Sequence, residues 1–186
     1  MTVVFVTGMS GTGKSAALAE LERRGNRVVD TDYGGWVDER PGTERVWRED
    51  RIDALLDEHD EGLLFVSGCV ANQGTFYPRF DAVVLLTAPD EVILERVAAR
   101  ESNDYGKTAE ERELILQDLA AVEPLLREGA TAEIDTRAPL TDVVDELERI
   151  ATTTSQCLAP CLAPGRVSIS RRSKRGAGGA AAPPGP

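Results

Sequence analysis

Residues 8–15 of the 186-residue chain have the sequence GMSGTGKS, which matches the pattern G-x-x-x-x-G-K-[ST] at every fixed position. An apolar run at residues 3–6 precedes the motif and predicts a buried strand, and the amphipathic residues 14–24 predict a helix after it. The order strand, glycine-rich loop, helix is the one that this motif requires. The motif therefore constrains the chain to an α/β fold with a ligand loop at the end of a strand.

The residue types in this motif predict that it binds the phosphates of a nucleotide. Its glycines allow backbone N–H groups to surround an anion at the positive end of the following helix. Lys14 is expected to reach the β- and γ-phosphates, and the Ser15 hydroxyl is expected to ligate Mg²⁺. The residues predicted to contact the nucleotide are Gly8, Met9, Ser10, Gly11, Thr12, Gly13, Lys14 and Ser15.

Beyond the motif, short apolar runs alternate with helical patterns. Each run is β-branched or rich in leucine, as expected for strands that are covered on both faces. We predict strands at residues 3–6, 27–29, 63–66, 83–86 and 132–134, and helices at residues 14–24, 44–59, 89–100, 110–128 and about 143–150. The alternation predicts a three-layer α/β fold, with a parallel five-stranded sheet and helices on both of its faces.

The composition of the chain changes near residue 151. All 32 acidic residues and 16 of the 21 basic residues lie in residues 1–150, whereas residues 151–186 are basic and end in a stretch of only Gly, Ala and Pro. Such a segment has too few large apolar side chains to offset the conformational entropy that ordering would cost. We predict one folded domain over residues 1–150 and a disordered basic tail over residues 151–186.

Charge and hydropathy exclude several classes of protein. The formal net charge of −11 disfavours strong binding to nucleic acid or to anionic lipid, because both depend on positive charge. No signal peptide and no apolar run long enough to span a membrane is recognisable, and three cysteines without regular spacing predict no disulfide framework. The expected location is the cytoplasm, and the oligomeric state is left open.

Two carboxylates, Asp30 and Asp32, follow the predicted second strand in the sequence VVDTD. Here the chain resembles the shikimate kinase and nucleoside monophosphate kinase branch of P-loop proteins, with a nucleotide-binding domain of the AAA family ATPase type. The resemblance covers residues 1–150. It implies that Asp30 helps to hold Mg²⁺ and that Asp32 orients or deprotonates the acceptor hydroxyl. The alternative is that both are solvated acids of a turn.

The same resemblance gives roles to two arginines near the fourth strand. In the family, the region that matches residues 100–108 is a small lid that bears arginine and closes over the nucleotide. Arg96 and Arg100 are therefore expected to stabilise charge on the transferring phosphoryl group. The alternative is that both are solvent-facing basic groups that interact favourably with a helix end.

The chain departs from the family where the acceptor binds. Shikimate kinases have an arginine that grips the substrate carboxylate, and the matching position here is Val122, so shikimate is not expected to be the acceptor. By analogy the acceptor lies beyond Asp32, where aromatic and basic residues such as Trp36 and Arg48 can stack on or pair with an anionic or heterocyclic molecule. Trp47, on the predicted helix at residues 44–59, is equally explained as a core residue.

These observations predict a kinase that binds ATP and Mg²⁺ and transfers the γ-phosphoryl group to a small-molecule hydroxyl or phosphate acceptor. The alternative is a regulatory ATPase or GTPase switch without such an acceptor. Residues 32–35 match the D-x-x-G pattern of GTPases, but they follow the wrong strand, and no N-K-x-D motif for guanine is present. ATP is therefore preferred to GTP, and the identity of the acceptor stays open.

Overall fold

A five-stranded parallel sheet forms the centre of the protein. The computed structural model describes residues 1–38, 44–100 and 106–158. The strands lie in the order β2-β5-β1-β6-β7, and every neighbouring pair is parallel. Their bounds are β1 Thr2–Thr7, β2 Arg27–Asp30, β5 Leu63–Ser67, β6 Ala82–Thr87 and β7 Ala132–Asp135. The five strands predicted from the sequence are therefore confirmed, each within one or two residues of its predicted ends.

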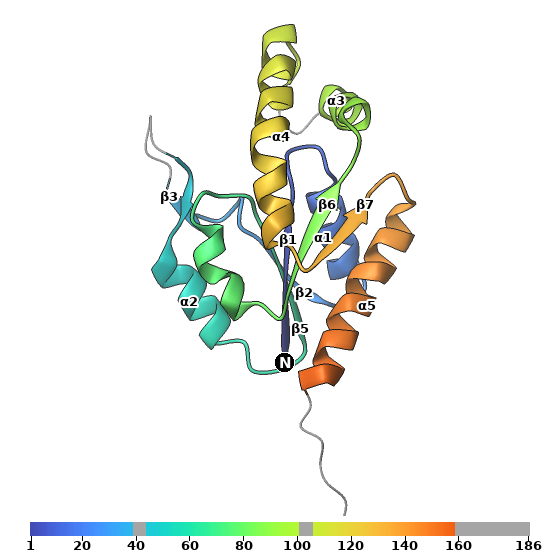
Figure 1. Ribbon diagram of the computed structural model, residues 1–186. Helices are drawn as coiled ribbons and strands as arrows, with labels where there is room; N and C mark the ends of the chain where they lie inside the picture. The colour runs from blue at the N-terminus through green and yellow to red at the C-terminus, as the bar shows by residue number, and fades with distance from the viewer. Residues whose placement is uncertain (39–43, 101–105, 159–186) are drawn as a thin grey trace, which may run out of the picture.

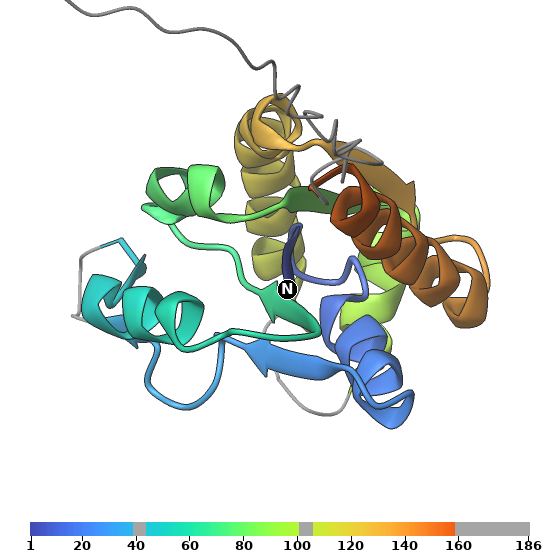
Figure 2. The ribbon, with the colours of Figure 1, turned by 90° about the horizontal axis from the view of Figure 1, so that it is seen from below.

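Helices cover both faces of this sheet, which gives three layers (Figures 1 and 2). In Figure 2, α1 and α5 lie on one side of the sheet, and α2, α4 and the short 3-10 helix η1 lie on the other. The bounds are α1 Lys14–Arg23, α2 Glu49–Asp57, η1 Gln73–Arg79, α3 Asp90–Ala99, α4 Ala109–Gly129 and α5 Leu140–Leu158. The predicted three-layer α/β fold is confirmed.

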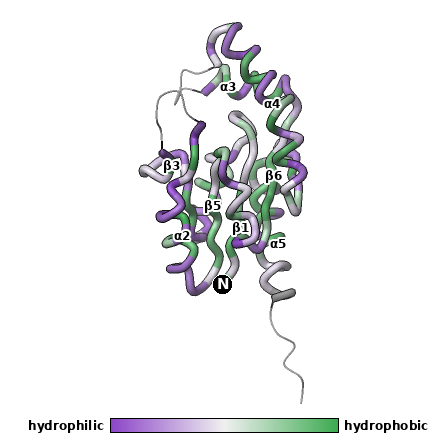
Figure 3. Tube along the Cα trace, turned by 60° about the vertical axis from the view of Figure 1, so that its left-hand side comes forward, coloured by the Kyte–Doolittle hydropathy of each residue, from purple (hydrophilic) through white to green (hydrophobic). Residues whose placement is uncertain are grey.

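The strands are apolar on both faces because both faces are covered. In β1, Val4 and Val6 pack against α1 and α5, whereas Val3 and Phe5 pack against α2, η1 and Trp47. The central strands are coloured mainly hydrophobic in Figure 3, in agreement with this double burial. Successive side chains of a strand point to opposite faces, so an uninterrupted apolar run fills two cores at once.

The helix predicted for residues 44–59 is wrong in its first part. Residues Val46–Trp47 form a short strand, β4, which pairs antiparallel with β3, Val37–Asp38, and α2 begins only at Glu49. The side-chain amide of Asn72 accepts a hydrogen bond from the Trp47 N–H at 2.8 Å and donates one to the Trp47 carbonyl at 3.1 Å. These bonds occupy the backbone groups that a helix would need, so Trp47 is extended. It is 1% exposed, as expected for a core residue.

The last helix, α5, extends beyond the domain boundary predicted at residue 150. Helix α5 continues to Leu158, and Ala151 is fully buried in the core formed by α1, α5 and the sheet. The boundary at residue 150 is therefore corrected, because the first residues of the predicted tail continue an amphipathic helix. The remainder of that tail, residues 159–186, lies outside the described residues, as does most of the predicted lid, residues 101–105.

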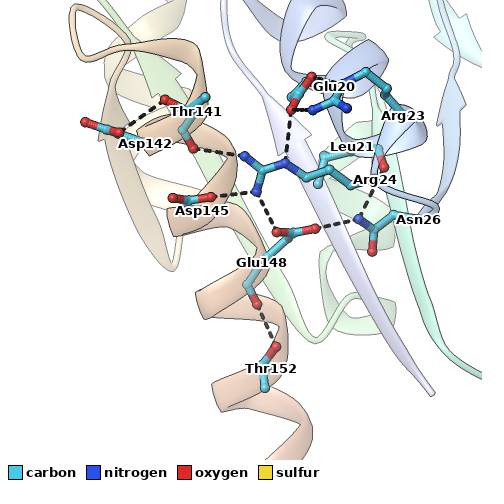
Figure 4. A network of polar contacts seen from close by, with 10 residues as sticks. All are labelled: Glu20, Leu21, Arg23, Arg24, Asn26, Thr141, Asp142, Asp145, Glu148 and Thr152. Carbon is cyan, nitrogen blue, oxygen red and sulfur yellow. Dashed lines mark hydrogen bonds and ion pairs between the residues drawn. The ribbon is translucent and has the colours of Figure 1, made fainter.

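An ionic network joins the end of α1 to α5 (Figure 4). The Arg24 guanidinium donates to Glu20 on its own helix at 3.1 Å and to Asp145 and Glu148 of α5 at 2.5 and 2.8 Å. Hydrogen bonds from Arg23 and then Arg24 lower the pKa of Glu20 to about 2. The network fixes the position of α5 relative to α1, the helix that follows the phosphate loop.

None of the helices in the described segments, including the long α4 and α5, combines the length and the apolar character that crossing a bilayer requires.

Candidate functional site

The predicted phosphate loop connects β1 to α1 at the carboxyl edge of the sheet. Its backbone requires glycine: Gly8 has φ 149°, and a Cβ there would lie 2.5 Å from the Leu86 carbonyl oxygen of β6. Gly13, at the N-cap of α1, has φ 95°, a region that residues with side chains rarely adopt. The buried Thr12 hydroxyl donates to the Met9 carbonyl at 2.8 Å, which is a hydrogen bond within the loop.

Lys14, the first residue of α1, folds back into this loop. Its ammonium group donates to the carbonyl oxygens of Gly8 at 2.6 Å and Met9 at 3.1 Å. Burial lowers the pKa of Lys14, and the nearby carboxylates of Asp32 and Asp30 oppose that change. The ammonium group therefore lies inside the loop that is predicted to surround the phosphates.

Asp30, the last residue of β2, contacts both the first turn of α1 and the backbone of Asp32. The Ser15 hydroxyl donates to Asp30 Oδ2 at 3.3 Å, and Asp30 Oδ1 accepts from the Asp32 backbone N–H at 3.1 Å. A hydroxyl and a carboxylate side by side fit the oxygen ligands that Mg²⁺ takes in nucleotide sites. The set predicted to hold the metal, Ser15 and Asp30, is thus brought together in the fold.

Thr31 fixes the chain between these two carboxylates. Its buried hydroxyl donates to the Ser67 carbonyl at 2.7 Å and accepts from Trp47 Nε1 at 2.8 Å. The side chain of Asp32 points to a different partner, since its Oδ1 accepts from Arg45 Nη2 at 3.2 Å. Both carboxylates therefore have hydrogen-bond partners, but Asp32 lies in an exposed turn, so the alternative that they are solvated acids of a turn stays open.

The two predicted arginines both contact the phosphate loop. Arg96 donates to the hydroxyl and carbonyl of Thr136, just after β7, at 2.8 and 2.6 Å, and it lies 3.5 Å from the Gly11 carbonyl oxygen. Arg100, at the end of α3, donates to the Ser10 hydroxyl at 3.0 Å. The structure thus brings both guanidinium groups to the loop from a neighbouring helix. Their part in catalysis stays a prediction.

These residues surround one cavity of about 590 Å³. The described residues that line it are Met9, Ser10, Gly11, Gly13, Lys14, Ser15, Ala16, Asp32, Tyr33, Arg45, Cys69, Arg96 and Arg100. Of the predicted site residues, Gly8, Thr12 and Asp30 do not line it. Gly8 and Thr12 belong to the phosphate loop, and Asp30 accepts a hydrogen bond from Ser15, which does line the cavity. The cavity lies where β1, β2 and β5 end, as expected for a parallel α/β sheet.

Arg45 is the charged cavity residue that sequence reasoning missed. Residues 44–59 have a helical pattern, and that pattern gives no sign that Arg45 lies beside Asp32. Its position depends on the hairpin of β3 and β4. Arg48, which the sequence suggested for the acceptor region, pairs with Asp50 at 3.2 Å and does not line the cavity. Cys69 also lines the cavity, and burial raises the pKa of its thiol.

A family model described as AAA domain matches residues 4–117, more than half of the chain, so the protein belongs to this AAA domain family. A search of curated proteins found no match to the chain. Among solved structures, the shikimate kinase from Acinetobacter baumannii in complex with shikimate is 20% identical with a TM-score of 0.59, over 82% of this chain and 94% of that chain. A gluconokinase from Sinorhizobium meliloti 1021 is 20% identical with a TM-score of 0.55, over 84% and 97%.

A sugar kinase from Janibacter sp. HTCC2649 is 21% identical with a TM-score of 0.52, over 83% of this chain and 98% of that chain. These similarities confirm the predicted fold, that of P-loop kinases of the shikimate kinase and nucleoside monophosphate kinase-like group.

Proposed function

We propose that the protein is an ATP-dependent kinase that transfers the γ-phosphoryl group to a hydroxyl or phosphate group of a small molecule other than shikimate. The observation that carries this proposal is a single cavity lined by both Lys14 of the phosphate loop and the Asp32 carboxylate. A carboxylate that does not hold the metal repels the phosphates, so nucleotide binding alone gains nothing from Asp32. A carboxylate at this place is useful when a second molecule, bearing a proton to be removed, binds there.

The reaction follows from this arrangement when the acceptor is a hydroxyl. Asp32 accepts the proton of the acceptor hydroxyl while the acceptor oxygen forms a bond to the γ-phosphorus. The bond between that phosphorus and the β,γ-bridging oxygen breaks, and ADP leaves with the electron pair. Lys14, Arg96 and Arg100 offset the negative charge on the phosphates during this transfer. Phosphoryl transfer depends mainly on such positioning and charge stabilisation.

Magnesium fits the same proposal. Ser15 and Asp30 are the residues that would hold it, because the Ser15 hydroxyl and the Asp30 carboxylate are 3.3 Å apart at the start of α1. The ion would neutralise part of the charge on the β- and γ-phosphates. Lys14 must exchange its present bonds to the Gly8 and Met9 carbonyls for phosphate oxygens when the nucleotide binds.

The similar structures support a small-molecule acceptor, since they are named as a shikimate kinase, a gluconokinase and a sugar kinase. Shikimate is excluded from the proposal because Val122 replaces the arginine that grips its carboxylate in shikimate kinases. A regulatory ATPase or GTPase switch is the alternative function. It predicts release of ADP or GDP at a rate that does not depend on any small molecule.

The experiment is a coupled assay of ADP release with ATP, Mg²⁺ and a panel of sugars, polyols, hydroxy acids and nucleosides. We expect at least one compound to stimulate release saturably. The variant Lys14→Ala should lose turnover and keep its fold. The variant Asp32→Asn should keep nucleotide affinity and lose about 100-fold or more in acceptor-dependent turnover, the usual scale for loss of a general base.

Asp50→Asn is the matched control, because Asp50 is an exposed carboxylate that pairs with Arg48 and does not line the cavity. It should behave like the parent protein. The kinase proposal is wrong if no compound stimulates ADP release, or if Asp32→Asn transfers phosphate at the parent rate.

A further inference from the structure

Gln73 is a buried amide next to the phosphate loop, and the proposed reaction gives it no role. It is the first residue of η1, it is 4% exposed, and it does not line the cavity. Burial of an amide costs free energy unless its polar atoms form hydrogen bonds, because water no longer satisfies them. The partners of this amide therefore show what the glutamine does in the fold.

The Gln73 amide forms hydrogen bonds at both of its polar atoms. Its oxygen accepts from the Val70 N–H at 3.0 Å. Its nitrogen donates to Thr7 Oγ1 at 3.2 Å and to the Tyr77 hydroxyl oxygen at 2.8 Å. A backbone N–H can only donate, so the bond from Val70 requires the amide oxygen on that side and directs the NH₂ group to the two hydroxyls.

Thr7 connects this amide to the phosphate loop. It is the last residue of β1, it is fully buried, and it directly precedes Gly8. Gly8 in turn packs so closely against β6 that a Cβ there would lie 2.5 Å from the Leu86 carbonyl oxygen. Because Gly8 has no free space on that side, a displacement of Thr7 is transmitted to the backbone N–H groups of the loop.

The bond between Gln73 and Thr7 becomes more important when a nucleotide binds. In the structure, the Gly8 carbonyl accepts a hydrogen bond from the Lys14 ammonium group at 2.6 Å. Lys14 gives up that bond when it turns to the phosphates, so the first residue of the loop loses a contact. The bond from Gln73 to Thr7 does not involve Lys14 and is kept in the nucleotide complex.

We propose that Gln73 is a positioning residue of the phosphate loop, which fixes Thr7 and thereby keeps the loop in the form that binds the phosphates. The proposal rests on the nucleotide binding of the function proposed above and does not depend on transfer to an acceptor. A preorganised loop binds more tightly because it loses less conformational freedom. The bond to Tyr77 has another role: the Tyr77 ring packs against Phe5 and Gly129 of α4, so this bond contributes to stability alone.

The test compares two variants that each remove one hydrogen bond from the same amide. Thr7→Val removes the hydroxyl that precedes the loop, and Tyr77→Phe, the matched control, removes the hydroxyl on the other side. Gln73→Met removes both bonds and keeps a side chain of similar length. Isothermal titration calorimetry with Mg²⁺ and a non-hydrolysable ATP analogue measures nucleotide affinity well below the Tm of each variant, and circular dichroism melts measure stability separately.

We expect Tyr77→Phe to lower Tm and to keep the nucleotide affinity of the parent. Thr7→Val should bind the nucleotide about 5- to 10-fold more weakly, the scale of one lost hydrogen bond. Gln73→Met should match Thr7→Val, and the double variant should bind no more weakly than either, because both changes remove the same contact. A residue with only a structural role would lower Tm and leave the affinity of the folded protein unchanged.

Three results would overturn the proposal: equal nucleotide affinity of Thr7→Val and the parent, equal losses in Thr7→Val and Tyr77→Phe, or additive losses in the double variant. If Gln73→Met does not fold, the comparison of the two hydroxyl variants decides. The kinase function fails separately. If the affinities are as expected and no compound stimulates ADP release, the role of Gln73 stands and the kinase function does not. A parent that binds no nucleotide overturns both.

Discussion

The hydrogen bond from Trp47 to Thr31 links the core to the two site carboxylates, and its removal has a calculable cost. Trp47 Nε1 lies 2.8 Å from Thr31 Oγ1, and both side chains are 1% exposed. In Trp47→Phe, the lost hydrogen bond costs about 1 kcal/mol and the smaller ring leaves a cavity worth about 1–2 kcal/mol. The free energy of unfolding should fall by about 2–3 kcal/mol, which lowers Tm by about 4–12 °C in a domain of this size.

A double-mutant cycle separates the hydrogen bond from the packing. Urea unfolding of the parent, Trp47→Phe, Thr31→Val and the double variant, followed by circular dichroism, gives the coupling energy between the two side chains. We expect a coupling of about 1 kcal/mol, since each single variant already removes the bond. A coupling near zero, with both single variants destabilised, would refute the view that this bond fixes the segment between Asp30 and Asp32.

Three further predictions concern the ionic network between α1 and α5 and the C-terminal part of the chain. Arg24→Gln should lower Tm measurably in a thermal melt, because Arg24 joins three carboxylates of α1 and α5, whereas Arg23→Gln should change it less. The pKa of Glu20 is lowered from 4.5 to about 2. The stabilisation that the ionised Glu20 provides is therefore present above pH 4.5 and is lost as the pH falls from 4.5 to 2. The free energy of unfolding of Glu20→Gln should fall less steeply than that of the parent over this pH range. Removal of residues 159–186 should leave Tm unchanged, whereas truncation before the buried Ala151 should lower it.

Much of the fold is local in origin, and for that reason it was predictable. The phosphate loop, the five strands and most helices follow from short-range patterns such as the apolar run that became β1 and the capping box of Thr108 and Glu111 in α4. The closeness of Ser15 and Asp30 follows as well, because both lie where parallel strands end, whereas their binding of Mg²⁺ and the binding of phosphates by Lys14 stay predictions.

The features that were missed depend on distant residues. The residues around Trp47 have a helical pattern in the sequence. The side chain of Asn72, 25 positions away, forms hydrogen bonds with the Trp47 backbone and holds it extended. Arg45 contacts Asp32 because β3 and β4 pair as a hairpin. Ala151 was assigned to the tail because the composition changes there, and composition carries no information on whether a small side chain packs against a sheet.

The central claim is that the γ-phosphoryl group of ATP is transferred to a second molecule in the cavity of Lys14 and Asp32. The most direct measurement is ³¹P nuclear magnetic resonance of a reaction containing the protein, Mg²⁺, ATP and the compound that best stimulates ADP release. We predict a new phosphate-ester or anhydride signal that grows in step with ADP and is absent with Asp32→Asn. Growth of the inorganic phosphate signal in step with ADP, with no new phosphorylated product, would contradict the account and favour a hydrolytic switch.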